Sequence, residues 1–236
     1  MARAILAEFL GTALLLAVIV GSGIMGETLA GGNAALALLA NALATGAGLV
    51  VLILVFGPIS GAHLNPVVTL SAALRGESAW TRVPPYLLAQ VAGAFAGVLL
   101  AHAMFGHPAF TPSTHARSGA GQLLSEVVAT LGLVLTIAAV QRHRPAVTPF
   151  AVPLFIVSAY WFTASTSFAN PAVTLARSST DTFAGIRPGD VAGFVLAQIV
   201  GGAIAVLLAG WLWSPAPAPA PGEVVAVAER DVASGA

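Results

Sequence analysis

Six long apolar stretches are the feature that most constrains this chain. They run over about residues 5–25, 34–57, 83–105, 123–140, 148–167 and 191–213. A helix that crosses the roughly 30 Å hydrocarbon core of a bilayer needs about 20 predominantly apolar residues, because it rises about 1.5 Å per residue. Because the stretches approach or exceed that length, we expect an all-α integral membrane protein with six transmembrane helices.

The composition excludes several classes of protein. Hydrophobic residues make up 58% of the chain and charged residues only 8%, whereas a soluble domain is about 25% charged. The formal net charge is zero, so no basic face is available for nucleic acid. The chain has no cysteine and contains neither a His-Glu-x-x-His nor a Gly-x-Ser-x-Gly motif. We therefore expect no enzyme activity, no metal and no cofactor.

The arginines predict the orientation in the membrane. An even number of spans places both termini on one side, and cytoplasmic segments are enriched in basic residues. With the N-terminus inside, six arginines lie in cytoplasmic segments and three lie outside. We therefore expect a multi-pass protein of the cell membrane with cytoplasmic termini. The inner set is Arg3, Arg75, Arg82, Arg142, Arg144 and Arg230, and the outer set is Arg117, Arg177 and Arg187.

The chain divides into a membrane part and a tail. Residues 1–213 form the predicted transmembrane domain. Residues 214–236 begin with a Pro-Ala repeat, a composition that favours extended conformations and forms no packed core. We expect these residues to be a disordered cytoplasmic tail.

Two further segments are predicted to form re-entrant half-helices. Residues 57–75 and 168–178 are too apolar for a solvent loop and too short to cross the membrane. The pairs Asn65-Pro66 and Asn170-Pro171 supply an N-cap residue followed by proline at the first helical position. Non-helical backbone at membrane depth is tolerated only where it is buried in protein or lines a wet cavity. These segments therefore indicate a pore or a substrate site.

The two halves of the chain repeat each other in the same order. Glu8-Phe-Leu-Gly-Thr12 matches Glu126-Val-Val-Ala-Thr130, and the segment 65–70 matches 170–175. Each half, about residues 5–105 and 123–213, has three spans, so the second half enters the membrane inverted. Inverted repeats place the half-helices opposite each other around a central path.

This arrangement predicts passage of uncharged molecules without ions. The N-terminal end of each half-helix carries unpaired N–H groups and the positive end of the helix dipole. Two such ends at the centre of a pore repel cations, while Asn65 and Asn170 donate N–H groups to a passing oxygen. The buried carboxylates of Glu8 and Glu126 are either proton relays or acceptors for the backbone of the half-helix loops.

These motifs resemble the aquaporin family of major intrinsic proteins. The likeness covers Ser60-Gly-Ala-His-Leu-Asn-Pro-Val-Val-Thr69, the second Asn-Pro-Ala, the six spans and the inverted repeat. It implies a homotetramer in lipid with one pore per subunit. It also assigns the pore motifs to Asn65, Pro66, Val67, Asn170, Pro171 and Ala172, where Val67 replaces the usual alanine.

The selectivity filter departs from the family pattern. Counting back from the asparagines places the filter at Thr45, Ser158, Ser167 and Val173. Most of the family carries an arginine where this chain has Val173, so we expect a wider neck that admits larger neutral solutes. The resemblance also assigns pore-lining backbone to Gly61, Ala62, His63, Thr166 and Phe168.

The stretch from Asn170 to Arg177 is similar to a bacterial subgroup associated with arsenic resistance, which lacks the filter arginine. This similarity implies metalloid hydroxides, such as arsenous acid or methylated arsenicals, beside water and glycerol. Arg177 lies one turn beyond Val173, where it either replaces part of the missing filter charge or anchors the half-helix and pairs with Asp181. Two other functions stay open: an ordinary water- or glycerol-selective aquaporin, and an ion-coupled secondary transporter.

Overall fold

The computed structural model describes residues 1–213, and the tail predicted for residues 214–236 lies outside this range. The described residues form helices and no strand. In chain order they are α1 (Ala2–Leu29), α2 (Ala34–Ser60), α3 (Pro66–Leu74), α4 (Val83–Phe105), α5 (Ala120–His143), α6 (Thr148–Phe162), α7 (Pro171–Arg177) and α8 (Val191–Leu212). Short 3₁₀ turns at Trp80–Arg82, Pro145–Val147 and Pro188–Asp190 lead into α4, α6 and α8.

Six helical segments have the length and hydropathy of membrane spans, as the sequence predicts. The fifth is shorter than expected. Its predicted range extended to residue 167, but α6 ends at Phe162, because Thr163 adopts extended backbone with φ −108° and ψ 140°. The chain then passes through irregular backbone to α7. The half-helices α3 and α7 begin at the expected prolines.

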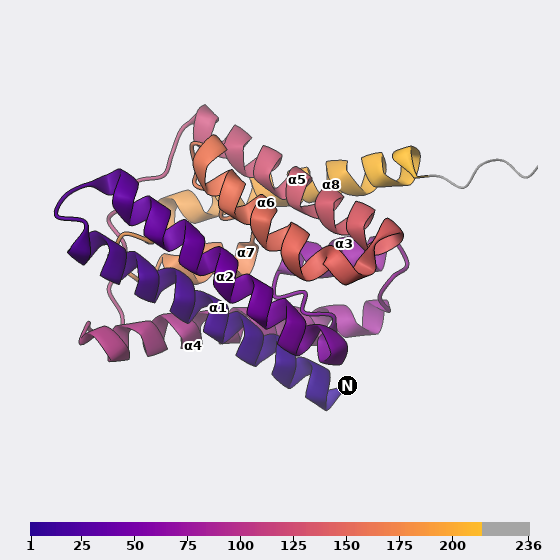
Figure 1. Ribbon diagram of the computed structural model, residues 1–236, viewed down its shortest axis with the longest axis horizontal. Helices are drawn as coiled ribbons and strands as arrows, with labels where there is room; N and C mark the ends of the chain where they lie inside the picture. The colour runs from indigo at the N-terminus through magenta and orange to yellow at the C-terminus, as the bar shows by residue number, and fades with distance from the viewer. Residues whose placement is uncertain (214–236) are drawn as a thin grey trace, which may run out of the picture.

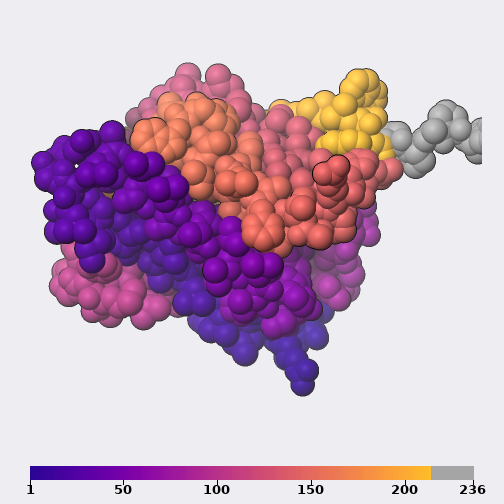
Figure 2. Space-filling view, in the orientation of Figure 1, coloured from indigo at the N-terminus to yellow at the C-terminus, as the bar shows by residue number. Residues whose placement is uncertain are grey.

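The helices pack in two equivalent groups (Figure 1). Helix α1 packs against α2 and α4, and α5 packs in the same way against α6 and α8. Helices α2 and α6 join the groups, and they lie side by side on the face shown in Figure 2. Each half-helix contacts both α4 and α8. The arrangement is the inverted repeat that the sequence predicts.

Glycines allow the closest helix approaches. A side chain at Gly93 or Gly97 on α4 would overlap backbone carbonyls of α1, and one at Gly201 on α8 would overlap the carbonyl of Val127 on α5. Small residues at such crossings let helix backbones touch in a membrane. Close helix contacts at glycine thus occur in both halves of the repeat.

The distribution of polarity is that of a membrane protein with a polar interior. Large apolar side chains such as Leu88, Leu154 and Leu207 are exposed on the outer surface of the bundle. Glutamate, glutamine and asparagine side chains are buried inside it. Both ends of the described chain lie at one end of the bundle (Figure 1). We call this the inner end, after the predicted orientation, and the opposite end, which carries the α4–α5 loop, the outer end.

Candidate functional site

Each half-helix starts at an asparagine that caps it. Asn65 has extended backbone, and its Oδ1 accepts the N–H of Val67 at 2.9 Å. Asn170 likewise accepts the N–H groups of Ala172 at 3.0 Å and Val173 at 3.3 Å. Capping by a side-chain oxygen satisfies donors that have no partner within the helix. It also fixes the two carboxamides at the centre of the molecule.

The two asparagines bind across the repeat. Nδ2 of Asn65 donates to the carbonyl of Ala169 at 2.8 Å, and Nδ2 of Asn170 donates to the carbonyl of Leu64 at 2.8 Å. Each carboxamide has two N–H donors, so one donor on each remains for a molecule in the pore. The carbonyls of Leu64 and Ala169 are thus occupied by these contacts.

The loops that precede the half-helices are held in unusual backbone conformations. Ala62 and Leu64 in the first loop, and Thr166, Ser167 and Ala169 in the second, have φ between 47° and 60°. For residues other than glycine this left-handed region costs about 1–2 kcal/mol per residue. The surrounding contacts must supply that energy, and the buried glutamates make those contacts.

Glu8 fixes the first loop. Its Oε1 accepts the hydroxyl of Ser60 at 2.6 Å and the N–H of His63 at 3.0 Å. Its Oε2 accepts the N–H of Leu64 at 2.7 Å and Nε2 of Gln90 at 2.8 Å. Four donors around one carboxylate satisfy its charge within the protein. No proton pathway is needed to explain its burial.

Glu126 repeats this arrangement in the second half. It accepts the N–H groups of Phe168 and Ala169, each at 2.9 Å, and Nε2 of Gln198 at 2.6 Å. Gln198 also donates to Thr174 at 2.8 Å. Both glutamates are fully buried. The glutamates therefore hold the backbone that carries the two asparagines.

A cavity of about 440 Å³ runs past both asparagines. At the inner end it is lined by Arg82, Glu77 and Gln141. In the middle its walls include Asn65 and Asn170, together with the predicted backbone residues Gly61, Ala62 and His63. At the outer end it reaches Ser167, Phe168, Val173 and Arg177.

The predicted filter positions near the outer end of the cavity, called the neck below, carry no charge. Thr45, Ser167 and Val173 all line the cavity. The Ser167 hydroxyl is buried and has no hydrogen-bond partner within residues 1–213. It is therefore free to bind a solute in the neck.

The structure does not place Ser158 at this neck. Ser158 is exposed, donates to the carbonyl of Phe155 at 2.8 Å and does not line the cavity. Tyr160 takes its place, and its hydroxyl lies 3.4 Å from Oγ1 of Thr45. The cavity-facing residues of α6 recur every four positions, at Thr148, Val152, Ile156 and Tyr160, which is the spacing of one helical face. That periodicity identifies Tyr160, whereas counting along the irregular segment does not.

Thr166 lies differently from expectation, and Arg177 does not make the contact with Asp181 that one of its alternatives predicts. Thr166 is not among the residues that line the cavity; its hydroxyl instead lies 3.4 Å from a guanidinium nitrogen of Arg117. Arg177 forms no ion pair with Asp181 in the part of the chain that the structure describes. Asp181 instead accepts the N–H of Thr114 at 2.8 Å. Arg117, for which the sequence predicts only a place in an outer loop, lies close to Phe168 at the outer end of the cavity.

Comparison with known proteins agrees with this geometry. Residues 1–164 match the family model described as "Major intrinsic protein". The chain is 56% identical over 215 residues to a protein named aquaglyceroporin AqpS from Rhizobium meliloti, with 91% of each chain covered. It is 33% identical over 171 residues to a glycerol uptake facilitator protein of Streptococcus pneumoniae, covering 64% of this chain and 70% of that one.

A solved structure shares the fold. The crystal structure of the aquaglyceroporin from Plasmodium falciparum superposes with a TM-score of 0.67 at 23% identity, over 88% of this chain and 94% of that chain. Six spans and two opposed half-helices around a central cavity define a membrane channel, not an enzyme. The chain belongs to the major intrinsic protein family, the aquaporins.

Proposed function

We propose that this protein is a passive channel for small uncharged solutes, with water, glycerol and metalloid hydroxides such as arsenous acid and methylated arsenicals among them. The observation that carries the proposal is that Thr45, Tyr160, Ser167 and Val173, all of which line the cavity, carry no charge. The names of the two bacterial relatives, an aquaglyceroporin and a glycerol uptake facilitator, support solutes larger than water.

The chemistry of the neck suits molecules that carry several hydroxyl groups. Thr45, Tyr160 and Ser167 offer three hydroxyls, each of which both donates and accepts hydrogen bonds. Val173 offers an apolar surface to the carbon or arsenic side of a solute. A polyol or a metalloid hydroxide replaces its lost water with these groups, whereas an ion cannot recover its hydration there.

The pore motifs supply the second part of the mechanism. The opposed ends of α3 and α7 present positive dipole ends toward the same point. The free N–H of Asn65 and of Asn170 orients an oxygen passing between them. We infer that this point blocks proton transfer, and that Glu8 and Glu126 act by positioning the loops rather than by carrying protons.

We further propose the assembly and orientation that the family resemblance and the arginines predict. Residues 1–213 form the channel domain, four copies associate through their apolar outer surfaces in the lipid, and both termini face the cytoplasm. The surface leucines support burial against lipid or a second copy.

The test is stopped-flow light scattering on proteoliposomes that contain the full chain, with water, glycerol and arsenous acid as solutes. We expect wild type to pass all three, with a flux that rises linearly with the gradient and is independent of ions. Val173→Arg should remove glycerol and arsenous acid flux while keeping water flux. A wild type that passes only water would refute the wide neck, and saturable, ion-dependent flux would favour a coupled transporter.

A further inference from the structure

Two guanidinium groups lie against the ring of Phe168 near the outer end of the cavity, although the filter position itself holds Val173. Arg177 lies with its Cζ 3.4 Å from the centroid of the Phe168 ring, and Arg117 lies with its Cζ 4.9 Å from the same centroid. Phe168 lines the cavity next to Ser167. Arg177 comes from α7 and Arg117 from the α4–α5 loop.

Arg177 is held in place without an acidic partner. Its side chain is 3% exposed and lines the cavity one helical turn beyond Val173. Its Nε donates to the carbonyl of Ala184, and its guanidinium stacks on Phe168. The contact with Asp181 that its position in the sequence allows is not made, because Asp181 accepts the N–H and hydroxyl of Thr114 at 2.8 and 3.0 Å.

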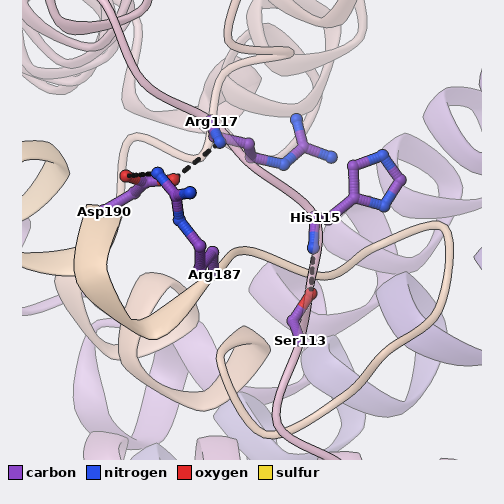
Figure 3. A network of polar contacts seen from close by, with 5 residues as sticks. All are labelled: Ser113, His115, Arg117, Arg187 and Asp190. Carbon is purple, nitrogen blue, oxygen red and sulfur yellow. Dashed lines mark hydrogen bonds and ion pairs between the residues drawn. The ribbon is translucent and has the colours of Figure 1, made fainter.

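Arg117 is held beside Phe168, near the outer end of the cavity, by contacts of its backbone. Its N–H donates to Oδ2 of Asp190 at 2.8 Å, while Oδ1 of Asp190 accepts from Arg187 at 2.8 Å. The backbone N–H of Arg187 donates in turn to the carbonyl of His115 at 2.7 Å. Figure 3 shows that the guanidinium of Arg117 points away from Asp190. The carboxylate therefore holds the loop and leaves the guanidinium unpaired.

The guanidinium of Arg117 binds backbone oxygens near the neck. Its Nε donates to the carbonyl of Gly185 at 2.8 Å, and its terminal nitrogens lie 3.3 Å from the carbonyl of Ser165 and 3.4 Å from that of Phe183. These acceptors orient the group but carry no negative charge. Within residues 1–213 neither Arg117 nor Arg177 forms an ion pair.

The charge of Arg117 persists despite its partial burial. Burial lowers the pKa of this guanidinium, and the negative charge of Glu126 opposes the shift, but an arginine stays protonated in proteins. The carboxylate of Glu126 is itself committed to the N–H groups of Phe168 and Ala169 and to Gln198. Glu126 thus orients the same loop and forms no ion pair with either arginine, although its charge offsets part of that of Arg117 at longer range.

We propose that Arg117, together with Arg177, forms a cation barrier at the outer end of the pore, replacing the charge that Val173 lacks without narrowing the neck. This inference rests on the proposed channel function and adds to it the residues that set charge selectivity. The Phe168 ring provides the surface on which both guanidinium groups are held. Because the charges lie beside the neck rather than across it, a large neutral solute passes while a cation is repelled.

The size of the effect follows from Coulomb's law. A unit charge roughly 6 Å from the path, at an effective dielectric constant of about 40, changes the occupancy of a monovalent cation by about tenfold. Removal of one guanidinium should therefore raise cation flux by about that factor, and removal of both should raise it further.

The experiment compares guanidinium with urea, two planar molecules of nearly equal size that differ by one charge. Both fluxes are measured by stopped-flow light scattering on proteoliposomes of the full chain, with potassium and valinomycin present to balance charge. We expect Arg117→Gln to raise the ratio of guanidinium to urea flux by about tenfold. The double variant Arg117→Gln/Arg177→Gln should raise it further, and Arg142→Gln, which removes an exposed arginine at the inner end, should not change it.

Arg117→Lys separates charge from structure. Lysine keeps the charge but cannot reproduce the several hydrogen bonds of the planar guanidinium. A charge barrier predicts that this variant stays within about twofold of wild type, since a point charge at that distance has the same effect. A purely structural role predicts that it leaks like Arg117→Gln.

The proposal is overturned if Arg117→Gln leaves the ratio unchanged, if Arg117→Lys leaks as much as Arg117→Gln, or if Arg117→Gln loses urea flux without gaining guanidinium flux. The channel function is tested separately by urea and glycerol flux in wild type above protein-free liposomes. If wild type passes neither, the channel function fails. The barrier then stands only if guanidinium flux appears in Arg117→Gln.

Discussion

Substituting glutamine for Glu126 tests whether this carboxylate holds the second pore loop. The change keeps the shape of the side chain but replaces one oxygen with an NH₂ donor. Oε1 accepts from Phe168, whereas Oε2 accepts from Ala169 and Gln198. If the glutamine oxygen takes the place of Oε2, it still accepts from Ala169 and Gln198, but its NH₂ group then faces the N–H of Phe168. At least one buried donor therefore loses its acceptor in either orientation.

The cost follows from these contacts. A stranded buried donor costs about 1–3 kcal/mol, and each remaining bond loses about 1 kcal/mol when its acceptor is no longer charged. Together these effects lower the free energy of unfolding by about 3–5 kcal/mol. For a chain of this size each kcal/mol shifts Tm by about 2–4 °C. We therefore expect Glu126→Gln to unfold at least 6 °C or so below wild type.

Thermal unfolding in detergent measures this shift, and glycerol flux reports the position of Asn170. We expect both to fall together, because the same backbone carries the left-handed residues and the asparagine. Glu8→Gln should behave in the same way, since either orientation of its amide faces two donors. Glu27→Gln, at an exposed position near the end of α1, is the control. A Glu126→Gln protein with the Tm and flux of wild type would refute the reasoning.

Three further predictions concern the neck, the outer loop and the helix packing. Tyr160→Phe removes a hydroxyl at the neck and should lower glycerol flux by about twofold to tenfold, while Ser158→Ala, which changes an exposed side chain, should leave it unchanged; an unchanged flux in Tyr160→Phe would place its hydroxyl outside the solute path. The hydrogen bonds from Thr114 lower the pKa of Asp181, so their stabilisation is present above the ordinary carboxyl pKa and is lost as pH falls through the lowered value. The exchange rate of the Thr114 amide, divided by its intrinsic rate at each pH, should thus rise only below about pH 4. Asp181→Asn should abolish this rise at low pH. Gly97→Ala places a methyl group against the backbone of α1 and should lower the free energy of unfolding by about 1–3 kcal/mol, measured by thermal unfolding; an unchanged Tm would show that the helices separate there without cost.

The parts of this fold that depend on local chemistry are the parts that the sequence predicts well. Asn65-Pro66 and Asn170-Pro171 mark the starts of α3 and α7, because a cap and a proline act on the adjacent turn alone. The spans follow from length and hydropathy. The pairing of the two halves follows from the repeated motifs.

Features that depend on irregular backbone or on distant partners were not predictable in this way. The filter position on α6 was counted back from Asn170 through residues 163–169, which form no regular helix, so the count selected Ser158 instead of Tyr160. Arg117 lies in a loop without a motif. Its place beside Phe168 depends on Asp190, which is 73 positions away along the chain, and no local pattern encodes that contact.

The reciprocal contacts of the asparagines have a consequence for how the channel assembles. Each half of the chain carries the carbonyl that orients the other half's asparagine, across 104 and 106 positions of sequence. Contacts at such separation form late, after local helices are in place. Neither half therefore possesses a finished polar lining by itself: the permeation path is created only when the two inverted halves dock, and selectivity appears in the same step as the tertiary fold.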